Sequence, residues 1–140
     1  MKEKKEVSIW YASATFYLTA GFAMPFIAGI IYDLFISRFI GGETLSNIVS
    51  IVFGLIGIWI GIVYAAKYIK KAYIIRDAKK LVNISTIYLI ILPFILLIGI
   101  YLFSGTFGIG PIAVIITIAI RAAIFYPLSR FYVKEDVKTE

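Results

Sequence analysis

The chain has 140 residues, of which 61% are hydrophobic and only 16% are charged, and its formal net charge is +6. A soluble domain is closer to half apolar and a quarter charged, so this composition predicts a protein that lipid solvates over much of its surface. The sequence contains neither cysteine nor histidine, which excludes disulfides, thiolate chemistry and sites built on imidazole. We therefore expect no metal, no cofactor and no enzymatic activity.

The first apolar segment, residues 8–36, is predicted to be a transmembrane helix. As a straight helix it would reach about 43 Å, which exceeds the hydrocarbon core of about 30 Å. Pro25 cannot donate a backbone hydrogen bond to Gly21, so we expect a kink there, either purely architectural or part of a substrate site. Asp33 is the only acidic residue inside a span. It lies near the outer end with Arg38, where it is either solvated among headgroups or able to bind a cation or relay protons.

The second predicted span, residues 44–66, carries small side chains at helical spacing. These are Ser46, Ser50, Gly54, Gly57, Gly61 and Ala65. Gly57 and Gly61 form a GxxxG pair, which allows another helix backbone to approach closely. Two interpretations stay open: assembly of identical copies through this helix, or packing within the bundle of one chain.

A basic segment, residues 67–84, is predicted to connect the second and third spans as a loop. Its cations are Lys67, Lys70, Lys71, Arg76, Lys79 and Lys80. Such a cluster attracts anionic lipid headgroups, at about 1 kcal/mol per cation near the surface. Alternatively, the cluster acts only as a determinant of membrane topology.

The third and fourth predicted spans are residues 85–103, with a second expected kink at Pro93, and residues 107–129. Tails of residues 1–7 and 130–140 flank the four spans. Helix is the expected state of each span because lipid offers no partner to unpaired backbone groups. The fold class predicted is therefore all-α, a single integral membrane domain built as a bundle of four transmembrane helices.

The basic residues predict how the chain is threaded. Lys2, Lys4 and Lys5 precede the first span, the basic loop follows the second, and Arg130, Lys134 and Lys138 follow the fourth. The opposite side holds only Arg38. This bias places both termini in the cytoplasm of a multi-pass protein of the plasma membrane. It also explains the positive net charge without a nucleic-acid partner.

Arg121 stands alone in the apolar run "ITIAIRAAIFYP" of the fourth span. It lies about 13 Å from Arg130 along a helix, close to the membrane midplane, where a charge costs about 2.5–3.5 kcal/mol on insertion scales. We therefore expect its side chain to face the bundle interior. Asp33 is predicted to lie about 20 Å further along the membrane normal, which is too far for direct contact.

Residues at a depth similar to that of Arg121 suggest how the guanidinium is satisfied. Thr15 and Thr19 are one helical turn apart in the first span, and Trp59 lies at a matching depth in the second. Hydroxyl oxygens and an indole face can both interact with a guanidinium. The hypothesis is a polar layer of Thr15, Thr19 and Trp59 around Arg121, which is either an anion site or a structural contact to the bundle or to a partner subunit.

Two classes of function are consistent with the sequence. The favoured class is a non-catalytic accessory, assembly or scaffold subunit that acts through helix contacts, as a homo-oligomer or with a partner membrane subunit. The alternative is a small oligomeric channel or transporter in which Arg121 contacts an anionic substrate or lipid. A bundle of four helices leaves little room for an internal pathway, which favours the first class.

Overall fold

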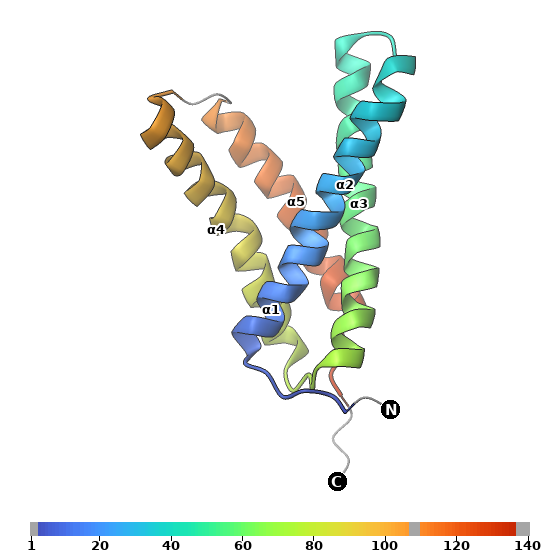
Figure 1. The fold of residues 1–140 in the computed structure, drawn as a ribbon, viewed down its shortest axis with the longest axis vertical. Helices are drawn as coiled ribbons and strands as arrows, with labels where there is room; N and C mark the ends of the chain where they lie inside the picture. The colour runs from blue at the N-terminus through green and yellow to red at the C-terminus, as the bar shows by residue number, and fades with distance from the viewer. Residues whose placement is uncertain (1–2, 107–109, 137–140) are drawn as a thin grey trace.

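The computed structural model describes residues 3–106 and 110–136, which form four helical spans (Figure 1). The first span is irregular: α1 (Ile9–Tyr17), a π-helical segment η1 (Leu18–Ala23), α2 (Met24–Ile31), a second π-helical segment η2 (Tyr32–Ile36) and a 3-10 turn η3 (Ser37–Phe39). The other spans are α3 (Glu43–Ala72), α4 (Ala78–Ser104) and α5 (Pro111–Tyr132). The all-helical prediction with four spans is thus confirmed.

Local sequence signals set where these helices begin and end. The Ser8 hydroxyl accepts a hydrogen bond from the Tyr11 N–H at the start of α1, and the Asp77 carboxylate accepts one from the Lys80 N–H at the start of α4. Gly105 ends α4 in the left-handed conformation, at φ 70°, which glycine adopts without steric cost. Pro111 opens α5, where its missing N–H would have no helical partner anyway.

Helices α3 and α4 are longer than the predicted spans, and the connection between them is shorter than the predicted loop of residues 67–84. Helix α3 continues to Ala72 and α4 begins at Ala78, so only residues 73–77 lie between them. Lys70 and Lys71 stabilise the last turn of α3 because cations favour the negative end of the helix dipole. The predicted start of the fourth span, residues 107–109, lies outside the described residues, as do residues 1–2 and 137–140 of the tails.

The four spans converge at one end and separate toward the other (Figure 1). The first span packs along α3 through η1 and α2, while α1 packs on α4 and α5 packs on both α4 and α3. Figure 1 shows α4 and α5 leaning away from α2 and α3, which gives the molecule a V shape. We call the end where the spans converge, at which Lys5 and Asp136 pair with the α3–α4 connection, the terminal end, and the opposite end the far end.

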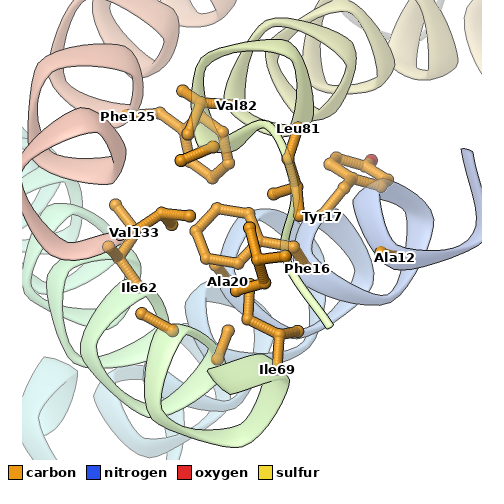
Figure 2. Close-up of a cluster of buried hydrophobic side chains, with 14 of the residues drawn as sticks. Ala12, Phe16, Tyr17, Ala20, Ile62, Ile69, Leu81, Val82, Phe125 and Val133 are labelled. Atoms are coloured by element: carbon orange, nitrogen blue, oxygen red, sulfur yellow. The ribbon is translucent and has the colours of Figure 1, made fainter. Parts of the chain in front are cut away.

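The hydrophobic core lies in the terminal half of the molecule (Figure 2). Phe16 of α1 is fully buried at its centre, with its ring centroid 5.7 Å from that of Phe125 on α5. Ile62 of α3 and Val82 of α4 are also fully buried in the same cluster. All four spans therefore meet around Phe16.

Outside this core, large apolar side chains cover the surface of every span. At most 28% of the residues in the most apolar window of any span are buried within the protein. Each span is also long and apolar enough to cross a membrane, over the part of the chain that the structure describes. Exposed apolar surface on this scale, on four helices of sufficient length, is compatible with a multi-pass membrane protein.

Three segments are joined at the terminal end. The Lys5 N–H donates to the Ala72 carbonyl at 2.8 Å, and the Ile74 N–H donates to the Lys5 carbonyl at 3.2 Å. The Asp136 carboxylate accepts a hydrogen bond from the Ile75 N–H at 2.7 Å and forms an ion pair with Lys4. The N-terminal segment, the α3–α4 connection and the C-terminal segment thus form one hydrogen-bonded unit, which we call the terminal clasp.

Candidate functional site: the Arg121 cavity

Arg121 lines a cavity of about 320 Å³ between the first span, α4 and α5. Tyr17 and Gly21 contribute from the first span, Leu89 and Pro93 from α4, and Thr117 from α5, one turn before Arg121. Among the described residues, the guanidinium is the one full charge at this cavity, whose other lining side chains are mostly apolar. The sequence predicted that Arg121 faces the bundle interior; its side chain lines this cavity but is exposed.

The Arg121 guanidinium forms no hydrogen bond or ion pair within residues 3–106 and 110–136. The Tyr17 hydroxyl lies within electrostatic range of the guanidinium. The Thr117 hydroxyl, which lines the same cavity, donates to the Ala113 carbonyl at 2.8 Å. The guanidinium is therefore placed at a cavity with its five N–H donors available to an external acceptor.

The other members of the predicted polar layer do not line this cavity. The Thr15 hydroxyl donates to the Tyr11 carbonyl at 3.0 Å within its own helix. The Trp59 indole N–H donates to the Tyr132 hydroxyl at 3.1 Å, so it joins α3 to the end of α5 instead of meeting Arg121. Thr19 is partly buried in η1. Tyr17 and Thr117, not Thr15, Thr19 and Trp59, are the polar residues beside Arg121.

Of the three predicted neighbours, Thr19 lies in the π-helical segment η1. Hydrogen bonds in a π turn span five residues, so side-chain positions rotate relative to a regular α-helix. Thr19 lies within η1, and its α-helical spacing from Thr15 therefore does not keep the two on a single face. The sequence could have indicated Tyr17 as a residue near Arg121, because it lies at a similar depth and its side chain ends in a hydroxyl group.

The small residues of α3 divide into two groups. A Cβ atom on Gly57 would lie 2.8 Å from the Ala28 Cβ, and one on Gly61 would lie 2.9 Å from the Ala20 Cα. This GxxxG pair therefore packs on the first span of the same chain, together with buried Ala65. By contrast, a Cβ atom on Gly54 would have no neighbour within 4 Å. Ser50 is partly buried, and Ser46 receives a hydrogen bond from the buried Tyr32 hydroxyl at its carbonyl, at 2.8 Å.

Pro25 and Pro93 occupy different environments. Pro25 is buried at the start of α2, directly after the π-helical segment, and its backbone meets Gly57 of α3. Pro93 lies inside the continuous helix α4 and lines the Arg121 cavity. A bend of the helix axis at either proline stays a prediction. Pro93 and Arg121 therefore lie at the same cavity.

The remaining charged candidates lie at the two ends of the molecule. Asp33 is exposed in η2 near the far end, and it forms no ion pair with Arg38 in the structure as described. At the terminal end, Arg76 pairs with Glu6, while Lys79 and Lys80 are exposed in the first turn of α4. Lys67, Lys70 and Lys71 line a separate basic pocket with the N-terminal segment.

Comparisons with known proteins assign no family to this arrangement. No family model matches the chain, and neither a curated protein nor a solved structure matches it.

Proposed function

We propose that the chain is a non-catalytic subunit of the plasma membrane, with both termini in the cytoplasm, that binds a partner membrane protein through the Arg121 cavity. The partner supplies a carboxylate from a transmembrane helix, which pairs with the guanidinium. The observation that carries this proposal is a mid-helix guanidinium at an open cavity with no acceptor among the described residues.

The position of Arg121 supports a partner within the membrane. Arg121 lies about 15 Å from each end of α5 at 1.5 Å per residue, so either interface is distant. A cation at this depth costs about 2.5–3.5 kcal/mol on insertion scales and is retained where it has a counter-charge or a function. An ion pair with a partner helix would satisfy the guanidinium.

The chain's own carboxylates do not serve this purpose. Asp33 and Glu43 lie near the far end, whereas Glu6, Asp77 and Asp136 belong to the terminal end. A second copy of the chain has the same distribution, with no carboxylate at the depth of Arg121 in the described ranges. The counter-charge therefore comes from a different molecule, which favours a hetero-oligomer over a homo-oligomer.

The packing of the core favours binding of a partner protein over binding of a substrate that enters from the cytoplasm. Phe125, Ser129 and Val133 follow Arg121 toward the terminal end of the chain and are buried, as is Phe16 before Tyr17. These side chains fill the space between the cavity and the terminal end. The cavity is thus closed on the side that the basic residues predict to be cytoplasmic, and the V shape opens on the opposite side.

A second candidate function is the binding of an amphipathic anion, such as a fatty acid or an anionic lipid, in a transporter or channel. The observation that favours it is the volume of the cavity, about 320 Å³, which lies at the small end of the range for ligand pockets. Apolar walls with a single cation fit a carboxylate that carries an apolar tail.

Site-specific photo-crosslinking in native membranes tests the proposed partner. A photoreactive amino acid at Thr117 would face the cavity, and the same probe at Ile115 would occupy an exposed position on the opposite side of α5. We expect one discrete protein adduct at Thr117, none of the same mass at Ile115, and loss of that adduct in Arg121→Gln. Arg121→Lys should retain part of it, because the charge remains.

The outcomes separate the two candidates. An adduct of protein mass that depends on the charge at residue 121 supports the partner. Adducts only of lipid or fatty-acid mass at Thr117 would contradict the partner and support the amphipathic anion. Equal adducts in Arg121→Gln and the native chain would contradict both, since each requires the guanidinium.

A further inference from the structure

A second pocket lies at the terminal end, away from Arg121. It has a volume of about 1540 Å³ and lies between the N-terminal segment, the start of α1 and the last turns of α3. Lys5, Lys67, Lys70 and Lys71 line it with the aromatic side chains Tyr68 and Tyr73. We call this set of six residues the terminal basic pocket.

Backbone pairing brings together two basic runs that are far apart in the sequence. Lys5 forms a parallel bridge with Tyr73, through the hydrogen bonds to Ala72 and Ile74 described above. Lys67, Lys70 and Lys71 lie at helical spacing of three and four residues, so their side chains leave α3 on one face. The N-terminal lysine is thus held opposite the lysines of α3.

The four ammonium groups have no ion-pair partner among residues 3–106 and 110–136. Lys4, which also lines the pocket, is already paired with Asp136, and Glu3 is the only carboxylate among the described residues of the lining. Lys70 also contributes to the field at Asp136, but a pocket lined by several cations attracts an anion. By contrast, Arg76 is paired with Glu6, and Lys79 and Lys80 are not part of the pocket.

The aromatic side chains around this pocket are of the kind that concentrates at the level of lipid headgroups. Tyr73 is buried, with its ring centroid 6.0 Å from that of Tyr11 and 6.2 Å from that of Tyr68. Tyr11, Tyr68 and the neighbouring Trp10 are about half exposed. Exposed Tyr and Trp side chains concentrate at membrane–water interfaces, where the ring contacts the acyl boundary and the polar tip contacts water.

From these observations we infer that the terminal basic pocket binds the headgroup of an anionic lipid that carries more than one phosphate group. Four lysines that line one pocket can contact more than one phosphate group, and lysine ammoniums are established phosphate ligands. Basic pockets at the cytoplasmic side of membrane helices bind such headgroups. The site does not involve Arg121, and its test is independent of the proposed partner.

Lipid binding to the purified full chain tests this inference. Nanodiscs that contain either cardiolipin, with two phosphates, or phosphatidylglycerol at equal total charge would be compared for lipid retention by native mass spectrometry. Inorganic phosphate would be added as a soluble competitor. We expect preferential retention of cardiolipin and no displacement at millimolar phosphate, because the lipid is also held by its acyl chains.

Two pairs of substitutions provide a matched comparison. Lys67→Gln with Lys71→Gln removes two charges inside the pocket, whereas Lys79→Gln with Lys80→Gln removes two charges just outside it. At roughly a fivefold loss for each lysine, the first pair should weaken cardiolipin binding about 25-fold, and the second by no more than a few fold. Lys67→Arg with Lys71→Arg should retain binding, which controls for folding.

Three outcomes would overturn the inference. Equal weakening by the two pairs would show diffuse attraction to the membrane surface and no pocket. Equal retention of cardiolipin and phosphatidylglycerol at equal charge would contradict recognition of more than one phosphate. Displacement of the lipid by inorganic phosphate would identify the ligand as a soluble anion.

Discussion

Single hydroxyl groups in the core show how burial and hydrogen bonding compete. The Ser85 hydroxyl of α4 lies 2.8 Å from the Leu81 carbonyl and 3.1 Å from the Ser13 carbonyl of α1, and the Ser13 hydroxyl donates back to Leu81 at 3.2 Å. Ser129 of α5 is equally buried, but its hydroxyl has no partner in the described part of the chain. One buried serine therefore joins two spans, while another is left unsatisfied.

We predict opposite effects when each of these two serines is changed to alanine. Ser85→Ala should destabilise the protein by about 0.5–1.5 kcal/mol, because it removes hydrogen bonds between buried groups. Ser129→Ala should be neutral or stabilise it by up to about 1 kcal/mol, because it removes an unsatisfied polar group. Unfolding in detergent, followed by circular dichroism, would measure both. Equal destabilisation by the two substitutions would contradict this account of the core.

At the scale of the helical elements, the sequence predicted the four helices well. It predicted poorly which side chains of neighbouring helices lie together. The four spans were predictable because an apolar run that crosses lipid has only one backbone solution. Helix α4 begins earlier than the predicted residue 85, and Asp77 could have indicated this start because its side chain caps the helix at the Lys80 N–H. No sequence signal predicted the π-helical segment η1, which packs on α3. The sequence predicted Thr15, Thr19 and Trp59 around Arg121, whereas Tyr17 and Thr117 are the polar side chains that line the cavity with it.

The packing of α3 on the first span leads to a prediction about its glycines. Gly61→Ala should destabilise the protein by about 1–3 kcal/mol, because the new methyl group would overlap the backbone of Ala20. Gly54→Ala has open space and should be neutral or stabilise the helix by up to about 1 kcal/mol. Thermal unfolding measures both effects. If Gly61→Ala instead left stability unchanged and altered the oligomeric state, the pair would serve assembly between copies.

On the scale of the whole molecule, the terminal clasp joins Lys4, Lys5 and Asp136 to the α3–α4 connection. Burial by itself would raise the pKa of Asp136, but the hydrogen bonds from Lys4 and the Ile75 N–H, with the charges of Lys4 and Lys70, outweigh it. The pKa of this carboxyl is therefore held below its ordinary value of 3.8. The ionised form is the one that the folded protein stabilises.

This lowered pKa predicts a dependence of stability on acid. The contribution of Asp136 is fully present above its ordinary pKa and is lost as the pH falls through the lowered pKa. Asp136→Asn should therefore reduce the unfolding temperature at pH 7, with the difference from the native chain narrowing below about pH 4. Asp33→Asn, at an exposed position away from the clasp, is the control. A difference that stays constant down to about pH 2 would contradict the role of the ionised carboxylate.

The proposed function requires that the Arg121 guanidinium is paired inside the membrane, away from cytoplasmic water. Because the chain has no cysteine, single-cysteine variants report water access without background. Thr117→Cys in inside-out vesicles should react with a water-soluble thiol reagent no faster than Ile115→Cys, whereas Lys79→Cys should react rapidly. Labelling of Thr117→Cys at a rate close to that of Lys79→Cys would show an aqueous path to Arg121 and would contradict the proposed partner site.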